Sequence, residues 1–195
     1  MTRLVLLRHG MTDWNRDKRI QGRIDQPLGE DGRRQFEQLA LPDEYRAYRW
    51  YCSPLTRARE SAELLGLDCH VEPVLIEMHW GEWEGEVLKP LRRRLGDVMR
   101  ANENRGLDFR PPGGESPREV QSRLLPWLGE VAARGEAVGA VAHKGIIRCI
   151  YALACDWDMR GDAPVEFAWD ALHLFDLSGS GRPLPGYRAV PLAAC

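Results

Sequence analysis

The sequence predicts an α/β protein of three layers, in which helices cover both faces of a mainly parallel central sheet and a small helical cap is inserted. Short apolar runs alternate with stretches of helical periodicity, an order typical of strand–helix–strand units. The runs at 3–7 and 137–142 carry apolar residues on both faces, as buried parallel strands do. A chain of 195 residues fits about one domain. We expect that domain to span 1–195, with a cap-like insertion at about 84–115.

The first half of the chain supplies strands and helices in alternation. A strand at 3–7 precedes a helix at 29–41 that Pro42 stops, and a second strand covers 48–52. Ser53 is expected to cap the next helix, with Pro54 in its first turn. That helix runs to Gly66, and 71–76 is a candidate third strand.

The second half continues the pattern after a segment of different character. A helix near 88–104 and a loop to 115 form the expected cap, and the Ser116 to Glu119 capping box opens the next helix. Pro126 is expected to kink that helix or to be absorbed by it. A strand at 137–142 and a helix at 146–154 follow. The last forty residues are expected to be rich in strands, at 165–169, 172–177 and 187–190.

Composition excludes several classes of function. The 27 basic and 29 acidic residues nearly balance, which argues against a general binder of nucleic acid or anionic membranes. Five cysteines at wide spacing do not form a disulfide framework or a zinc ribbon, and Cys52 and Cys149 are interpreted as core residues. No secretory signal or membrane-length apolar stretch is recognised. We therefore expect a cytoplasmic protein whose partner is a small molecule; the sequence does not indicate its oligomeric state.

Two of the predicted strands are followed by a histidine, a basic residue and a glycine. One leads into Arg8-His9-Gly10 and the other into His143-Lys144-Gly145, while Arg57 lies in the first turn of a helix that follows a third strand. Ligands of open α/β sheets bind at the carboxyl ends of the strands. Two imidazoles, two guanidinium groups and helix N-termini at one edge favour a compact dianion, and a phosphoryl group fits best.

An imidazole can attack phosphorus when it is neutral. A backbone carbonyl near Gly10 can hold the other ring nitrogen as N–H, which fixes the attacking tautomer. Each residue has a plainer alternative: a single strand-end histidine is usually a satisfied polar residue, and Arg8 or Arg57 alone would usually lie on a surface or helix face. The ordered combination favours the phosphoryl site.

Six blocks of sequence carry a family resemblance, and they appear in the order that the family has. They are Arg8-His9-Gly10-Met11-Thr12-Asp13-Trp14-Asn15, Ile20-Gln21-Gly22 with Asp25-Gln26-Pro27-Leu28, Ser53-Pro54-Leu55-Thr56-Arg57-Ala58, 75–85 around Glu77, Pro112-Gly113-Gly114-Glu115-Ser116, and Ala142-His143. Together they resemble the histidine phosphatase superfamily, also called phosphoglycerate mutase-like, over about residues 3–150.

The resemblance implies a role for each matching residue. His9 would be the nucleophile that becomes phosphohistidine, and Arg8, Arg57 and His143 would bind the phosphoryl oxygens. Glu77 would protonate the leaving oxygen and then activate water, and a carboxyl beside an oxyanion has the raised pKa that this role requires. Glu82 is the alternative acid. The resemblance also implies that Asn15, Gln21 and Gly22 bind the phosphate and the rest of the substrate.

Two departures from the family pattern stand out. Met11 occupies a position where relatives usually carry Glu or another polar residue, and we expect little effect on the chemistry. Lys144 occupies a position where many relatives have Gly. It either binds a further anionic group of the substrate or is a solvated lysine at a helix start. Trp14, Trp80 and Trp83 are interpreted as core residues rather than stacking platforms, and Arg92-Arg93-Arg94 as a solvated helix face.

The favoured function is a hydrolase: a phosphatase of the histidine acid phosphatase type that needs no cofactor and no metal. Family mutases generally have a larger insert between the acid and the second histidine, and only 65 residues separate Glu77 from His143 here. Three alternatives stay open: a phosphoglycerate mutase-type phosphoryl transferase, a non-catalytic phosphate-sensing module, and a metallohydrolase using His9, His79, Glu77 and His143. No ligand spacing typical of a metal site supports the last.

Overall fold

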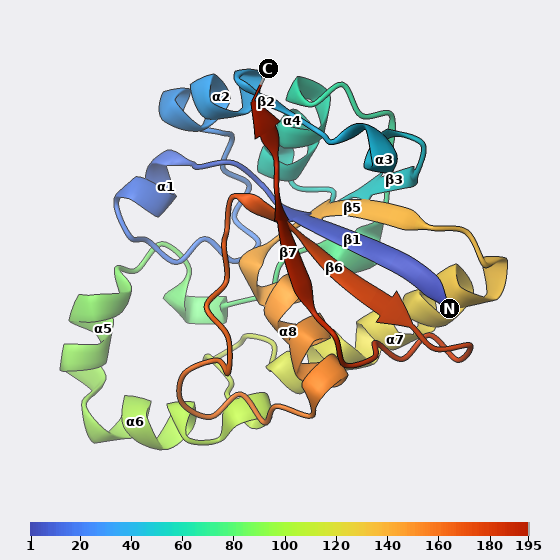
Figure 1. The fold of residues 1–195 in the computed structure, drawn as a ribbon. Coiled ribbons are helices and arrows are strands. Elements are labelled where there is room, and N and C mark those ends of the chain that lie inside the picture. Colours follow the sequence, from blue (N-terminus) through green and yellow to red (C-terminus); the bar gives the residue numbers. More distant parts are fainter. Residues whose placement is uncertain (195) are drawn as a thin grey trace.

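The computed structural model describes residues 1–194, so Cys195 lies outside the described residues. Six strands form the central sheet in the order β4-β3-β5-β1-β6-β7 (Figure 1). Their bounds are β1 Thr2–Arg8, β3 Arg49–Cys52, β4 Cys69–Val71, β5 Val138–Ala142, β6 Ala171–Leu177 and β7 Arg188–Pro191. Strands β4, β3, β5 and β1 run parallel, whereas β6 and β7 are antiparallel to their neighbours. The mainly parallel sheet is confirmed.

Helices cover both faces of this sheet (Figure 1). One face carries α2, α3 and α4, and the other carries α7 and α8. Leu4 and Leu6 of β1 pack into the core beneath α7 and α8, while Val5 and Leu7 pack into the core beneath α2 to α4. This alternation follows from the two-residue period of a strand, and it confirms the three layers. The helices are α2 Glu30–Glu37, α3 Asp43–Arg46, α4 Thr56–Leu64, α7 Pro117–Arg134 and α8 Lys144–Cys155.

The segment 84–115 lies at one side of the sheet layers (Figure 1). It contributes to a small apolar cluster of its own. The cluster joins Ile20 and Trp83 to Leu91 of α5 (Leu88–Leu95) and Met99 of α6 (Asp97–Glu103). The single helix expected at 88–104 is wrong, because Gly96 has a φ of 51° and separates α5 from α6. A short 3₁₀ turn, η3 Gly106–Asp108, follows α6.

Three other expected elements differ from the structure. The helix at 29–41 ends at Glu37, because the next residues form β2 (Leu39–Ala40) and pair with β8 (Ala193–Ala194). The strand expected at 71–76 is wrong: β4 ends at Val71, and a 3₁₀ turn follows at Pro73–Leu75. Proline lacks the N–H that a continuing ladder needs. The strand expected at 165–169 is irregular chain.

The starts of two helices near the sheet edge also differ from the prediction. Helix α4 begins at Thr56 with Leu55 as its N-cap, so Ser53 is not the cap. Helix α7 has the predicted capping box and contains Pro126 without ending there. Helix α8 begins at Lys144, two residues before the expected start. A short helix, α1 Asp13–Arg16, follows the first strand.

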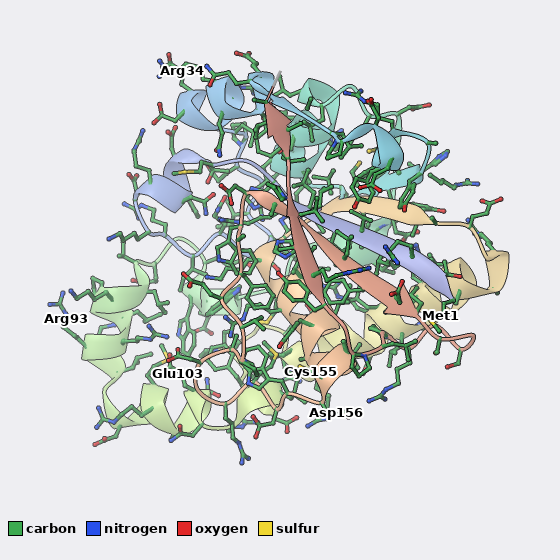
Figure 2. The ribbon with its side chains drawn as sticks, in the orientation of Figure 1. Met1, Arg34, Arg93, Glu103, Cys155 and Asp156 are labelled. Atoms are coloured by element: carbon green, nitrogen blue, oxygen red, sulfur yellow. The ribbon has the colours of Figure 1, made fainter. Side chains whose placement is uncertain are left out.

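Charged side chains surround the outside of the molecule, and Arg93 projects at its edge (Figure 2). Arg92 and Arg94 pair with Glu103 and Glu86 and remain 55 % and 60 % exposed, which confirms the solvated helix face. No helix within 1–194 combines the length and apolarity that a bilayer crossing requires.

The structure also tests the prediction that certain cysteine and tryptophan side chains belong to the core. Cys52 and Cys149 are buried, as expected. Trp83 is buried, and it and Trp80 both pack against Phe109 in the cluster beneath α5 and α6, so the core interpretation of these two rings is confirmed.

Candidate active site

Two neighbouring strands bring His9 and His143 together. Arg8 at the end of β1 pairs with Ala142 at the end of β5, so the residues that follow lie side by side. The His9 N–H donates to the Ala142 carbonyl over 3.1 Å. The two ring centroids are 5.1 Å apart, and both rings are buried. A single tetrahedral oxyanion is small enough to contact both imidazoles at this separation.

The ring of His9 is fixed in one tautomer. Its Nδ1 lies 2.7 Å from the Gly10 carbonyl oxygen, which can only accept, so Nδ1 carries the proton. The lone pair is therefore on Nε2. The turn at Gly10 is held by the Ser61 hydroxyl, which accepts from the Gly10 N–H over 2.9 Å, and a Cβ at Gly10 would lie 2.9 Å from the ring of Phe36.

His143 is held by Ser53, the residue that follows β3. Its Nε2 lies 2.7 Å from Ser53 Oγ, and its Nδ1 is a buried atom without a hydrogen-bond partner among the described residues. Cys52 pairs with Val141 across β3 and β5, which places Ser53 beside the end of β5. Because the Ser53 hydroxyl can donate to Nε2, Nδ1 can carry the proton and donate to an anion. Sequence reasoning treated Ser53 as a helix cap and missed this contact.

Two arginines flank the imidazoles. Arg57 lies in the first turn of α4, is only 1 % exposed, and donates to the Ile24 carbonyl over 3.0 Å and the Gly22 carbonyl over 2.7 Å. Its Nε and that of Arg8 are buried, and neither atom has a hydrogen-bond partner within residues 1–194. Buried polar groups are normally satisfied, so unpaired donors of this kind are expected where an anion binds.

Burial, and then the neighbouring charges, keep both imidazoles neutral. Burial, followed by the nearby Arg57 and Arg8, lowers the pKa of His9 well below its usual value. Burial is also the main cause that lowers the pKa of His143. Burial lowers the pKa of both arginines too, but a guanidinium remains charged. The arrangement thus keeps neutral imidazoles beside permanent cations.

Glu77 lies beside the first turn of α8. Its Oε1 accepts from the Met78 N–H over 2.9 Å, and its Oε2 accepts from the Gly145 N–H over 3.2 Å. Burial raises the pKa of Glu77 and outweighs these two hydrogen bonds, which lower it. Glu82, the alternative acid, is exposed.

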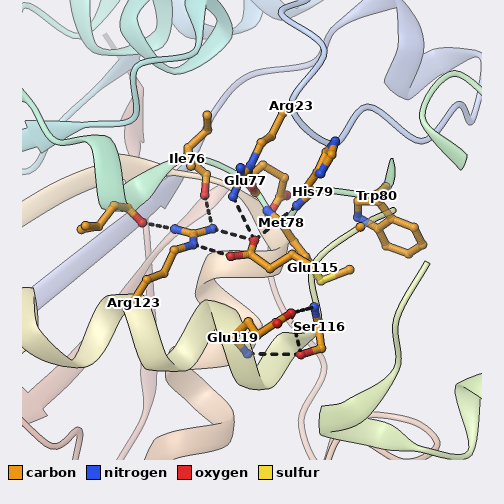
Figure 3. A network of polar contacts seen from close by, with 12 residues as sticks. Arg23, Ile76, Glu77, Met78, His79, Trp80, Glu115, Ser116, Glu119 and Arg123 are labelled. Atoms are coloured by element: carbon orange, nitrogen blue, oxygen red, sulfur yellow. Dashed lines mark hydrogen bonds and ion pairs between the residues drawn. The ribbon is translucent and has the colours of Figure 1, made fainter. Parts of the chain in front are cut away.

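The backbone that carries Glu77 is tied down by Arg123 of α7 (Figure 3). Arg123 donates to the Ile76 carbonyl over 2.7 Å and also to the Val74 carbonyl. Its Nε donates to Glu115 Oε1 over 2.9 Å, and the two side chains are 20 % and 14 % exposed. One half-buried guanidinium therefore fixes two carbonyls just before Glu77.

Glu115 links this network to the other side of the site (Figure 3). Its Oε2 accepts from Arg23 Nη2 over 3.2 Å and from the His79 N–H over 3.4 Å, while its own N–H donates to the His79 carbonyl over 2.8 Å. Arg23 Nε also donates to the Glu77 carbonyl over 3.3 Å. The sequence signalled Glu115 only as part of a motif and gave no sign of its partners.

The predicted substrate-binding residues of the N-terminal loop are held by hydrogen bonds to Thr12 and Arg57. Asn15 Oδ1 accepts from the Thr12 N–H over 3.1 Å, and Gln21 Oε1 accepts from the Thr12 hydroxyl over 2.9 Å. Gly22 has a φ of 51°, and its carbonyl accepts from Arg57 Nη2. The loop thus leads from Asn15 to the arginine, and each of these three side-chain or backbone oxygens already has a protein partner.

Lys144 is exposed at the start of α8, and its ammonium lies 5.0 Å from the ring centroid of Trp169. Sequence reasoning missed Trp169 because the segment around it was expected to be a strand. Met11 is 41 % exposed.

The four residues of the metal-site hypothesis are not arranged as a ligand set. His79 Nε2 lies 3.7 Å from Glu84. Within residues 1–194, no group of three or more His, Cys, Asp or Glu side chains is placed to hold a metal ion.

The fold and these strand-end imidazoles define a three-layer α/β protein with a cationic, histidine-containing site. The chain belongs to the histidine phosphatase superfamily, branch 1, whose family model matches residues 4–182.

Named relatives include both phosphatases and mutase-like proteins. The chain is 30 % identical to phosphoglycerate mutase-like protein 4 of Arabidopsis thaliana, covering 89 % of this chain and 80 % of the relative. It is 34 % identical to a metal-independent phosphoserine phosphatase of the same plant, covering 77 % and 68 %. A mycobacterial glucosyl-3-phosphoglycerate phosphatase, solved in complex with VO3, superposes with a TM-score of 0.76 at 25 % identity and 97 % coverage of both chains.

Proposed function

We propose that this chain is a phosphoric monoester hydrolase of the histidine acid phosphatase type, which removes the phosphoryl group from a small phosphorylated metabolite through a phosphohistidine on His9. The observation that carries the proposal is the 2.7 Å contact of His9 Nδ1 with the Gly10 carbonyl. It leaves Nε2 free to attack, in a site where Arg57, Arg8 and His143 each have a buried nitrogen without a hydrogen-bond partner in the described part of the chain.

In the first step, the Nε2 lone pair of His9 forms a bond to phosphorus while the ester P–O bond breaks. The leaving oxygen takes a proton from the Glu77 carboxyl, which the raised pKa keeps available. Arg8, Arg57 and the Nδ1–H of His143 stabilise the charge on the three equatorial oxygens.

In the second step, the Glu77 carboxylate accepts a proton from water as the water oxygen attacks phosphorus. The P–N bond breaks, His9 regains its lone pair, and inorganic phosphate leaves. Glu77 is again protonated, so protons balance over the cycle without a metal or cofactor. We further propose that Asn15, Gln21 and Gly22 seat the substrate through their contacts with Thr12 and Arg57.

Two further expectations belong to the same proposal. The segment 84–115 would act as a small cap next to the site, where its length favours hydrolysis over the mutase reaction. The protein would work in the cytoplasm on a small substrate, without nucleic acid or membrane.

Hydrolysis of p-nitrophenyl phosphate tests this proposal. We expect the wild type to release phosphate and His9→Ala to lose that activity while keeping its thermal unfolding midpoint. Equal activity in the two proteins would contradict the proposal, and no activity in either would favour the phosphate-sensing alternative. Isomerisation of 3-phosphoglycerate without net phosphate release would favour the mutase alternative.

A further inference from the structure

A pair of cations shares one aromatic ring at the rim of the site. The ammonium of Lys144 lies 5.0 Å from the ring centroid of Trp169, and Cζ of Arg8 lies 5.7 Å from the same centroid. Arg8 precedes His9 and Lys144 follows His143, so both cations adjoin the residues proposed to hold the phosphoryl group. Aromatic faces attract cations at these distances.

The ring of Trp169 is itself held in place. It stacks on Phe167, with centroids 4.8 Å apart and planes inclined by 23°. It also lies 5.7 Å from the ring of His173, a fully buried residue of β6. Trp169 therefore presents a supported surface rather than a freely moving side chain, and it fixes where Lys144 and Arg8 can lie.

This group of cations has no acidic partner at ion-pair distance. Among residues 1–194, the ion pairs within 4.0 Å include none of Lys144, Arg8 and Arg148. Arg148 lies one helical turn after Lys144 on α8, with its guanidinium 4.9 Å from Trp157. Desolvation of the ammonium, followed by the like charges of Arg148 and Arg8, lowers the pKa of Lys144 against the opposing effect of the Glu77 carboxylate. Crowded positive charges without a carboxylate at ion-pair distance are stabilised when an anion binds.

We infer that Lys144 and Trp169 form a subsite for a second negative charge on the leaving group, so that the substrate is a phosphomonoester carrying a carboxylate or another anion near the ester. Lys144 pairs with that anion, and the face of Trp169 contacts the carbons between it and the phosphoryl group. Because Lys144 directly follows His143, which is proposed to bind the phosphoryl group, the anion lies on the first few carbons beyond the ester oxygen.

The inference rests on the proposed hydrolysis and names its substrate class. It uses residues that the general chemistry of phosphoryl transfer does not require, because Arg8, Arg57 and His143 already face the phosphoryl group. Lys144 is also one of the positions where this chain departs from the family pattern. A solvated lysine that merely stacks on Trp169 is the competing interpretation, and it predicts no selectivity for charge.

Two matched pairs of esters separate these interpretations. Phosphoglycolate differs from ethyl phosphate, and 3-phosphoglycerate from glycerol 3-phosphate, by a carboxylate on the leaving group. We expect the wild type to prefer the carboxylate member of at least one pair by about tenfold in kcat/KM, the scale of one charge-assisted contact. Lys144→Met should remove most of that preference, and Lys144→Arg should keep most of it.

Lys89→Met, which removes an exposed lysine from α5, is the matched control and should retain the wild-type preference. Trp169→Leu should weaken the preference by releasing Lys144. Phosphate release and thermal unfolding are measured for every variant. A wild type without preference in either pair, or a Lys144→Met protein that keeps it, overturns the subsite alone. A wild type that hydrolyses neither these esters nor p-nitrophenyl phosphate overturns the proposed function, and the subsite with it.

Discussion

Replacing Gly145 by alanine displaces the proposed acid without weakening the fold. Gly145 is the second residue of α8, and its N–H donates to Glu77 Oε2. A Cβ at this position would lie 2.3 Å from Glu77 Oε1, whereas ordinary contact begins near 3.4 Å. The carboxylate must therefore retreat by about 1 Å. A displacement of that size in an active site can cost about 100-fold in rate.

The free energy of unfolding of the variant should change little. Gly145 has a helical backbone that alanine also adopts, and alanine in a helix is favoured over glycine by up to about 1 kcal/mol. This gain offsets the loss of the hydrogen bond from the Gly145 N–H to Glu77, which is worth about 1 kcal/mol. Gly129→Ala on α7 is the matched control, because its Cβ would meet only the Ser180 carbonyl oxygen at 3.7 Å.

The assay compares kcat/KM for an alkyl phosphate and for p-nitrophenyl phosphate, together with urea unfolding. The alkyl leaving group needs a proton, so Gly145→Ala should lose about 100-fold with it and less with the aryl ester. Gly129→Ala should match the wild type with both. A folded Gly145→Ala protein within about twofold of the wild type on the alkyl ester would refute the placement of Glu77.

Further predictions concern the groups around the acid and the imidazoles. The pKa values of His9 and His143 are lowered in the folded protein, so below pH 6.5 the unfolded chain binds more protons than the folded one. The free energy of unfolding should therefore be unaffected by these histidines above pH 6.5 and should fall as the pH drops below that value. Each histidine should lower the free energy of unfolding by up to about 1.4 kcal/mol per pH unit. The urea midpoint should therefore differ less between pH 7.5 and pH 5.5 in a His9→Gln/His143→Gln variant than in the wild type. Ser53→Ala should cost about 1–3 kcal/mol, because it leaves a buried ring nitrogen unpaired; a urea midpoint equal to the wild type would contradict this. Arg123→Met should cost about 3 kcal/mol and reduce kcat more than it changes KM, with partial rescue by Arg123→Lys; a loss of stability at full kcat would reduce Arg123 to a structural role.

The sequence was sufficient for the parts of the fold that depend on local patterning. The apolar runs before His9 and His143 are buried parallel strands, and their adjacency puts the two rings 5.1 Å apart. The capping box at Ser116 marks the start of α7, as expected. Each of these signals is local, because the residues that carry it belong to the predicted element or lie next to it.

Other features depend on contacts that no local pattern encodes. The break at Gly96 has no local signal, because a single glycine is tolerated within a helix at a cost of about 1 kcal/mol. The segment at 165–169 has the aromatic content of a strand, but Phe167 and Trp169 pack on side chains instead of joining the ladder.

The candidate site also combines residues that a sequence motif indicates with residues that only contacts distant in the chain reveal. Glu77 could be chosen over its neighbouring carboxylates only by motif register, whereas the structure separates it from the exposed Glu82 by burial and by its contact with Gly145. Arg123 lies 46 residues after Glu77 in the chain, so its support of the loop before Glu77 had no signal in spacing. Ser53 could have been found from its place at the end of a strand next to β5.

Direct detection of phosphorus on His9 tests the central claim. In Glu77→Gln, p-nitrophenolate can leave without a proton, but water loses its base, so the phosphoenzyme should accumulate. Rapid mixing with p-nitrophenyl phosphate should give a burst of one nitrophenolate per chain, and mass spectrometry of the quenched protein should find an acid-labile phosphoryl group on the peptide that contains His9. Phosphate release without a burst, or a phosphoryl group on any other residue, would contradict the account.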